Sequence, residues 1–206
     1  MLKSVLFDLD GTLIDSADGV IFSLREALNE IGCDSVIELT SKIIGPPLPD
    51  LINKVCCDRI QPETKALAIK HFKKSYDSIG YKKTNSFDGI ERLLENLSKS
   101  GFVMYIVTNK RESVTKKIIS RLGWTHFFKS IYCIDMFHKL VDTKTDLLKK
   151  LLDDFDLDPC QCVYIGDTLE DKLSSELNRV RFIPASWNVY GLSGGPITPD
   201  LLFRGL

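Results

Sequence analysis

Short apolar runs that end in polar residues recur along the chain, and this recurrence limits most strongly what the chain can fold into. The first run lies within residues 3–10 and stops at Gly11, and four later ones cover residues 102–107, 130–134, 162–165 and 180–183. Such runs are typical of buried strands that arrive at a turn. Between them, residues 90–97, 114–122 and 147–155 carry apolar side chains at helical spacing. Strands alternating with helices predict an α/β fold, a doubly wound parallel sheet with helices on both faces.

The alternation is interrupted between residues 16 and 80, where only helical signals occur. Apolar spacing and glycine stops indicate helices over residues 20–31, 36–44, 51–55 and 68–79. The 206 residues of the chain also exceed the ~150 of a typical single domain. We therefore expect an α/β core of residues 1–15 and 84–206, with a small all-α domain of residues 16–83 inserted after the first strand.

Charge and cysteine content exclude several classes of partner. Lysine and arginine number 27 and aspartate and glutamate 28, so no overall positive field exists to hold nucleic acid or an anionic membrane. Residues 54–83 are locally basic, with eight lysines and arginines against three acids. This pattern is typical of a solvated helix face, and it is also able to steer an anionic substrate. No apolar stretch approaches the ~20 residues of a membrane span, and no secretory signal is recognised. The six cysteines lack zinc-ligand spacing, so we expect reduced thiols in a cytoplasmic protein.

Polar residues follow three of the expected strands, at the sheet edge where open α/β sheets bind their ligands. These residues are Asp8, Asp10, Gly11, Thr12, Thr108, Asn109, Gly166, Asp167, Thr168 and Asp171. Asp8 and Asp10 alternate along one strand, so their carboxyl groups are expected to face one small volume and share a cation. Asp167 adds a third carboxylate from another strand end. Three hard oxygen donors predict a Mg²⁺ site, because a zinc site would use His or Cys.

A fixed positive charge is needed beside these aspartates, both to keep them ionised and to balance a phosphoryl group. Lys144, near the start of the helix before the fourth strand, is the expected residue, and Lys139 is the alternative. Glycines at positions 11 and 166 leave room where the backbone approaches a ligand. Thr108 and its neighbouring backbone amides are placed to bind a phosphate oxygen.

Four ordered segments resemble the motifs of the haloacid dehalogenase-like (HAD) hydrolase superfamily, whose core is Rossmann-like. They are Phe7-Asp8-Leu9-Asp10-Gly11-Thr12-Leu13, Val107-Thr108-Asn109-Lys110, Lys144 and Gly166-Asp167-Thr168-Leu169-Glu170-Asp171. Gly45-Pro46-Pro47-Leu48 in the helical insert is similar to a loop in the caps of phosphoglycolate phosphatase-like members. The chain departs from the family pattern at Thr145, where relatives often have proline, and at Asn178-Arg179, where many have Ala-Gly.

The resemblance implies a role for each motif residue. Asp8 would be the nucleophile that becomes an aspartyl phosphate, and Asp10 would act first as acid and then as base. Thr108 and Lys144 would hold the phosphoryl oxygens. Gly11, Thr12 and Asn109 are expected at the substrate. Mg²⁺ would be bound by Asp8, by the backbone carbonyl of Asp10, by Asp167, and by Asp171 directly or through water.

These expectations describe a Mg²⁺-dependent phosphatase that acts on a small phosphorylated metabolite, as a monomer or homodimer. The resemblance implies that dehalogenating relatives have a non-acidic residue at position 10, so Asp10 favours a phosphomonoester with a poor leaving group. Two alternatives stay open, a phosphomutase of the β-phosphoglucomutase type and a catalytically silent phospho-binding regulatory protein.

Overall fold

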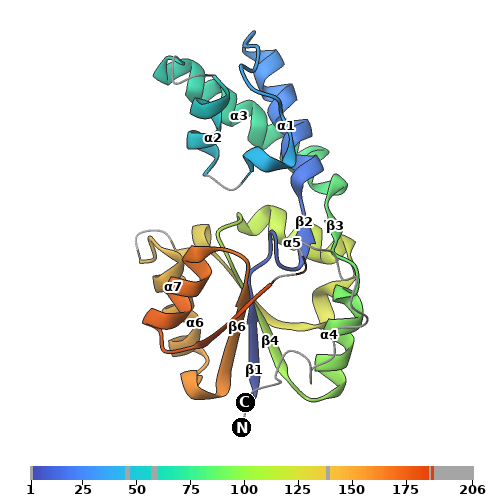
Figure 1. Cartoon of the computed structure of the whole chain (residues 1–206), viewed down its shortest axis with the longest axis vertical. Helices are drawn as coiled ribbons and strands as arrows, with labels where there is room; N and C mark the ends of the chain where they lie inside the picture. The colour runs from blue at the N-terminus through green and yellow to red at the C-terminus, as the bar shows by residue number, and fades with distance from the viewer. Residues whose placement is uncertain (1, 45–46, 57–59, 138–139, 186, 188–206) are drawn as a thin grey trace. The chain divides into compact units, whose positions relative to one another are not determined.

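The computed structural model describes residues 2–44, 47–56, 60–137, 140–185 and 187. It divides into two units, which we call the core unit, Met1–Asp15 with Ser86–Leu206, and the helical unit, Ser16–Asn85. The core unit contains a five-stranded parallel sheet in the order β5-β4-β1-β6-β7 (Figure 1). Its strands are β1 Ser4–Phe7, β4 Val103–Thr108, β5 Phe128–Cys133, β6 Cys162–Gly166 and β7 Arg181–Pro184. The predicted α/β fold with a parallel sheet is confirmed.

The strand order determines which helices cover which face of the sheet. The chain moves outward from β1 through β4 to β5, and then returns to the other side of β1 for β6 and β7. Crossovers between parallel strands are right-handed. The helices that precede β4 and β5 must therefore lie on one face of the sheet, and the helices that precede β6 and β7 on the opposite face. Figure 1 shows α6, Lys144–Asp154, and α7, Leu169–Leu177, together on one side of the sheet and α4, Ile90–Lys99, on the other. The fourth α-helix described in this unit is α5, Glu112–Arg121.

The central strand β1 is buried along its whole length. It pairs with β4 on one side and with β6 on the other, so that Phe7 lies level with Ile106 and Ile165. A strand covered on both faces needs apolar residues at every position, which explains the uninterrupted apolar runs in the sequence. On the α6 face, buried leucines of that helix pack against the sheet at Leu6, Tyr105 and Tyr164.

The helical unit consists mainly of three helices, α1 Ala17–Glu30, α2 Leu48–Val55 and α3 Pro62–Ser78, followed by a 3₁₀ turn at Gly80–Lys83. Its buried side chains include Leu24, Ile52 and Phe72, one from each helix. Two short strands that the sequence did not predict, β2 Ile14–Asp15 and β3 Asn85–Ser86, form a separate two-stranded sheet.

Among the described residues, no helix is both long and apolar enough to cross a membrane.

The helix expected over residues 36–44 is wrong. This segment is irregular apart from a 3₁₀ turn at Ser41–Ile43. The Ser35 hydroxyl donates to the Ile37 carbonyl at 2.6 Å, and the Val36 amide donates to the Val55 carbonyl at 3.0 Å. These hydrogen bonds occupy backbone groups that would otherwise pair within a helix. The β-branched residues of the segment also have a low helix propensity. The glycine and first proline of the loop at 45–48 lie outside the described residues.

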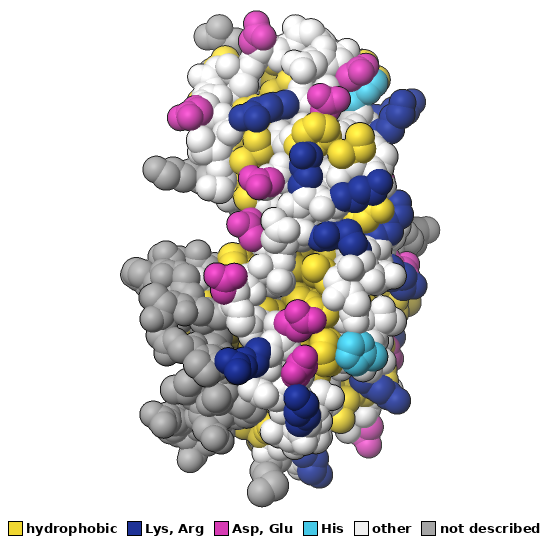
Figure 2. Space-filling model, turned by 90° about the vertical axis from the view of Figure 1, so that its right-hand side faces the viewer, with side chains coloured by type: hydrophobic (Ala, Val, Ile, Leu, Met, Phe, Trp, Pro, Cys, Tyr) yellow, Lys and Arg dark blue, Asp and Glu magenta, His cyan; other side chains and the backbone are white. Residues whose placement is uncertain are grey.

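The basic residues expected on the helical unit lie at its surface. Exposed lysines are found at positions 54, 70, 73, 74, 82 and 83. Figure 2 shows several lysine and arginine side chains close together on this unit, with acidic side chains around them. Exposed charges of this kind are solvated, so they form a locally positive surface without defining a binding site by themselves.

Close packing at Gly19 leads to the first prediction. A Cβ atom added at Gly19 would lie 2.3 Å from the backbone oxygen of Gly80. Gly19→Ala is therefore expected to lower the free energy of unfolding by about 2 kcal/mol in urea denaturation, as overpacking does. The same change in an exposed helix would instead stabilise by up to ~1 kcal/mol, because alanine favours helix.

The matched control is Ser98→Ala, at an exposed position of α4. It should change the unfolding free energy by less than ~0.5 kcal/mol. An increase in stability for Gly19→Ala would show that α1 does not approach Gly80 this closely.

Candidate active site

Three strand ends bring the candidate residues to one edge of the sheet. The Asp8 amide directly follows β1 and donates to the Ile165 carbonyl of β6 at 2.9 Å. Thr108 is the last residue of β4, and Asp167 follows the last residue of β6. The order of the strands reverses beside β1, which is where open α/β sheets form their binding crevice.

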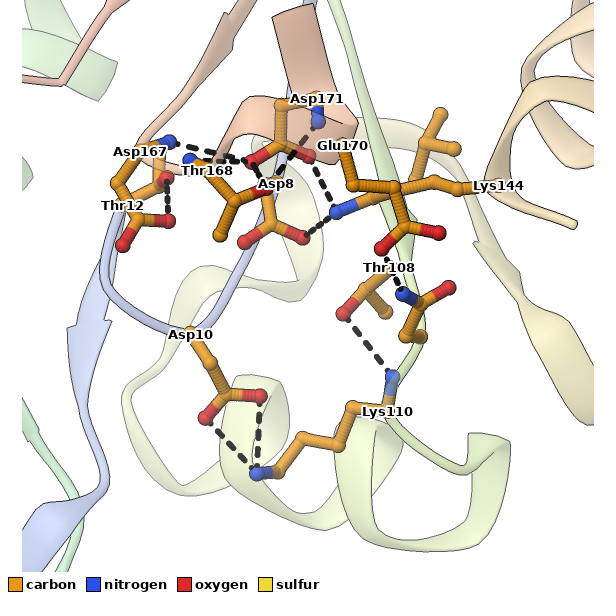
Figure 3. Close-up of polar contacts among 12 residues, drawn as sticks. Asp8, Asp10, Thr12, Thr108, Lys110, Lys144, Asp167, Thr168, Glu170 and Asp171 are labelled. Carbon is orange, nitrogen blue, oxygen red and sulfur yellow. Dashed lines mark hydrogen bonds and ion pairs between the residues drawn. The ribbon is translucent and has the colours of Figure 1, made fainter. Parts of the chain in front are cut away.

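Lys144 lies between two of the aspartates (Figure 3). Its Nζ donates to Asp8 Oδ1 at 2.6 Å and forms an ion pair with Asp171. Lys144 is the first residue of α6, where the hydroxyl of the capping residue Thr143 accepts a hydrogen bond from the Asp146 amide. The side chains of Lys144, Asp8 and Asp171 are 3%, 6% and 0% exposed, so these charges have lost most of their water. Lys139, the alternative lysine, lies outside the described residues.

Burial and neighbouring charges shift the pKa values of this cluster in opposite directions. Burial raises the pKa of Asp8 to about 7, although the ammonium of Lys144 opposes the rise. Burial alone would lower the pKa of Lys144, but Asp8 and Asp171 raise it above its usual value. Burial also acts to raise the pKa of Asp171, but Lys144 and Thr168 outweigh it, and that pKa lies below its usual value. One ammonium is therefore shared by two carboxylates and cannot neutralise both of them.

Asp171 organises the first turn of α7. Its Oδ2 accepts hydrogen bonds from the Thr168 hydroxyl at 2.6 Å and from the Thr168 amide at 2.9 Å, and the Asp171 amide donates back to that hydroxyl in a capping box. Its Oδ1 accepts from the hydroxyl of Tyr164, which is fully buried. A Cβ atom at Gly166 would lie 2.5 Å from Asp171 Cγ, so glycine is required there. Asp171 thus fixes the loop that carries Asp167.

The donor set at this edge fits a hard divalent cation. Asp8, Asp167 and Asp171 each offer a carboxylate oxygen, and these oxygens lie within 4.8 Å of one another. Burial raises the pKa of Asp167, and the charge of Asp171 adds to the rise. The Thr12 hydroxyl lies 3.4 Å from Asp167 Oδ1. Oxygen donors alone suit Mg²⁺, and the uncompensated negative charge favours a cation.

Asp10 does not join this cluster as expected. Its carboxylate oxygens lie 2.9 and 3.0 Å from Nζ of Lys110, and Figure 3 shows the carboxylate directed to that lysine, apart from Asp8. The expectation that Asp8 and Asp10 face one volume assumed that the strand continues. In the structure β1 ends at Phe7, and Gly11 has a φ of +80°, so strand alternation does not extend to position 10.

The residues expected at the substrate surround the aspartates but contact protein atoms. Thr108 is buried, and its Oγ1 accepts a hydrogen bond from the Lys110 amide at 3.2 Å. The side-chain amide of Asn109 donates to Glu170 at 2.8 Å. A Cβ atom at Gly11 would lie 2.2 Å from Asp167 Oδ2, so only glycine lets the loop after β1 pass this close.

Four residues near the site were not identified by the sequence analysis as functional: Lys110, Tyr164, Glu170 and Trp187. Trp187 donates from Nε1 to the Thr12 carbonyl at 2.8 Å, and Tyr164 bonds the Val107 carbonyl at 3.1 Å. Lys110 and Glu170 lie inside two of the motif segments quoted above, and this position could have identified them as residues of the site. Tyr164 lies within an apolar run and Trp187 after the last strand, where no pattern distinguishes them from core residues.

The buried ion cluster leads to the second prediction. Lys144→Met would leave Asp8 and Asp171 as buried carboxylates without their shared ammonium. We expect the free energy of unfolding at pH 7 to fall by about 4 kcal/mol, because removing one partner strands a buried charge. Lys99→Met removes an exposed ion pair with Glu95 and should cost less than ~0.5 kcal/mol. Equal losses for the two variants in urea denaturation would contradict the burial of the cluster.

Comparison with known proteins agrees with this geometry. Residues 5–185 match the family model described as haloacid dehalogenase-like hydrolase. The chain is 31% identical to a 5'-nucleotidase of Pseudomonas aeruginosa, over 87% of this chain and 80% of that protein. It is 32% identical to a phosphoglycolate phosphatase of Aquifex aeolicus, over 82% of this chain and 78% of that protein.

A solved structure gives the same result for the fold. The haloacid dehalogenase-like hydrolase of Streptococcus pneumoniae superposes with a TM-score of 0.79 and 28% identity, covering 98% of this chain and 90% of that one. The resemblance inferred from the four motifs is therefore confirmed. The chain belongs to the haloacid dehalogenase-like hydrolase family.

Proposed function

We propose that the protein is a Mg²⁺-dependent phosphatase that hydrolyses the phosphate monoester of a small metabolite through an aspartyl phosphate on Asp8. The observation that carries this proposal is the joint placement of Asp8, Lys144 and Asp167 at one sheet edge. Relatives named as a phosphoglycolate phosphatase and a 5'-nucleotidase support it, because both names describe hydrolysis of a phosphomonoester.

Asp8 is suited to nucleophilic attack by the way its carboxylate is held. Lys144 donates to Oδ1 at 2.6 Å, which restrains the carboxylate and would leave Oδ2 for attack on the phosphorus atom. In the first step a bond forms between Oδ2 and phosphorus while the ester bond breaks. In the second step water attacks the same phosphorus atom and releases Asp8. The ammonium of Lys144 and the Thr108 hydroxyl would hold the phosphoryl oxygens.

Asp10 is proposed as the proton donor to the leaving oxygen and then as the base that activates water. In this structure its carboxylate is bound by Lys110 through both oxygens. The Asp10 side chain is 37% exposed, so this ion pair can exchange its partners at modest cost. Asp10 would therefore leave Lys110 when the substrate's leaving oxygen arrives.

Mg²⁺ is proposed at the carboxylate cluster. Asp8 and Asp167 would hold it, with the backbone carbonyl of Asp10 as a further donor. Asp171 would position Asp167 and would not bind the ion directly, because the Asp171 oxygens already accept several hydrogen bonds. When bound, the ion supplies positive charge that offsets the carboxylates and the phosphoryl group.

The third prediction concerns activity. Purified protein with Mg²⁺ is expected to release inorganic phosphate from at least one member of a panel of phosphomonoesters, including phosphoglycolate, sugar phosphates and nucleoside monophosphates. Asp8→Asn should lower kcat at least ~10³-fold, because it removes the nucleophile. Asp10→Asn should lower it by about 10²-fold or more, the contribution typical of an acid–base group.

The control for this assay is Asp153→Asn, an exposed carboxylate on α6, which should keep wild-type activity. Equal activity in wild type, Asp8→Asn and Asp10→Asn would exclude the mechanism. Transfer of phosphate from the phosphoenzyme to a sugar in place of water would identify a phosphomutase, and a panel without any turnover would favour the silent regulatory alternative.

The fourth prediction tests the metal site without an activity assay. Mg²⁺ at ten times its Kd should stabilise the protein by about 1.4 kcal/mol through binding to the native state alone. For a chain of this length that is a rise in Tm of about 4 °C. Asp167→Asn should abolish most of the rise, whereas Asp153→Asn should keep it. A rise that survives in Asp167→Asn would place the ion elsewhere.

A further inference from the structure

Two cysteine sulfurs are in contact within the helical unit. Sγ of Cys33 and Sγ of Cys56 are 3.2 Å apart. A disulfide bond measures about 2.05 Å, so the sulfurs need to approach by about 1.2 Å, a distance that side-chain rotation covers. Both are thiols in the structure. This juxtaposition is independent of the carboxylate cluster and of the proposed phosphatase function.

Hydrogen-bonded helix ends hold both cysteines in place. After α1, the Cys33 amide donates to the Leu28 carbonyl at 3.0 Å and the Gly32 amide donates to the Asn29 carbonyl at 3.1 Å. This is a Schellman motif, and Gly32 has the positive φ of 64° that such a motif requires. The sulfur of Cys33 is therefore carried by a defined turn and not by a freely moving loop.

The second cysteine is fixed in a similar way. The Cys56 amide donates to the Ile52 carbonyl at 3.1 Å at the end of α2. Beside it, the Val36 amide donates to the Val55 carbonyl at 3.0 Å, which ties the chain after Cys33 to the chain before Cys56. The contact between the sulfurs thus follows from the packing of two chain segments against each other.

The two thiols differ in exposure in a way that suits stepwise oxidation. Cys33 is half-buried and Cys56 is 7% exposed. Elsewhere in the chain, burial raises the pKa of the Cys133 thiol to about 12 and that of Cys162 to about 11, which keeps both unreactive. Cys33 is accessible to a small oxidant and has a second sulfur within reach.

We propose that Cys33 and Cys56 form a reversible disulfide when the protein meets a peroxide. The Cys33 sulfur attacks one peroxide oxygen, the O–O bond breaks, one water leaves and Cys33 becomes a sulfenic acid. The Cys56 sulfur then attacks the Cys33 sulfur, the S–O bond breaks and a second water leaves. In total two thiols lose two electrons and two protons, and one hydrogen peroxide is reduced to two waters.

The bond would join the end of α1 to the end of α2 and close the chain between residues 33 and 56 into a loop. Cross-linking a loop restricts the unfolded chain and stabilises the folded one. Oxidised protein is therefore expected to have a higher Tm than reduced protein. The thiol that reacts with peroxide would be protected from irreversible oxidation because its partner resolves it.

Peptide mapping tests the fifth prediction directly. The full chain is treated with hydrogen peroxide, blocked with an alkylating agent and digested with trypsin without reductant. Cleavage after Arg25, Lys42, Lys54 and Arg59 gives one peptide with Cys33, residues 26–42, and one with Cys56, residues 55–59. We expect these two peptides linked, with a mass about 2 Da below their sum, and separated by dithiothreitol.

Cys57 lies in the same tryptic peptide as Cys56, so variants are needed to assign the bond. The linked species should persist in Cys57→Ser and in Cys160→Ser, and should be absent in Cys33→Ser and Cys56→Ser. Persistence in Cys56→Ser would assign the bond to Cys57 and overturn the proposal. Wild-type protein that yields only sulfinic or sulfonic acid at Cys33, or only cross-links between chains, would overturn it as well, and neither result depends on a variant folding.

Discussion

One ammonium group buried between two carboxylates connects three parts of the chain that are far apart in sequence. Lys144 begins α6, Asp8 follows β1 and Asp171 lies in the first turn of α7. Each of these charges alone would be costly to bury, and only their proximity offsets the lost hydration. The cluster therefore requires that the sheet and both helices be in place, and the position of Asp167 follows from the same loop that Asp171 holds.

Backbone packing makes this charge cluster possible. Gly11 and Gly166 lie where a Cβ atom would overlap the carboxylates of Asp167 and Asp171. Glycine at these positions lets two strand ends approach each other with acidic side chains between them. The charge cluster therefore depends on these two glycines, because a side chain at either position would push the carboxylates apart and weaken their attraction for one cation.

The sequence indicated four of the five strands to within two residues and placed Lys144 beside Asp8, but it did not predict that β1 ends at Phe7 or where Asp10 points. Strand ends follow from local apolar patterning, and Lys144 follows from the charge that buried aspartates require. The direction of Asp10 depends on a turn with positive φ and on Lys110, which is distant in sequence. The irregular segment at 36–44 was missed for a related reason, since its bond to Val55 is a tertiary contact that helical spacing does not reveal.

The two ion pairs at the site differ in exposure, and this difference matches their proposed roles. In the pair of Lys144 with Asp8 the side chains are 3% and 6% exposed, whereas in the pair of Lys110 with Asp10 they are 11% and 37% exposed. A desolvated pair is held rigidly, because separating it leaves a buried charge without a partner. In the second pair the Asp10 carboxylate is partly open to water, so water can take the place of Lys110 at a lower cost. A nucleophile needs a fixed orientation and a proton carrier needs to move between the leaving group and water, so the burial of each carboxylate suits the step proposed for it.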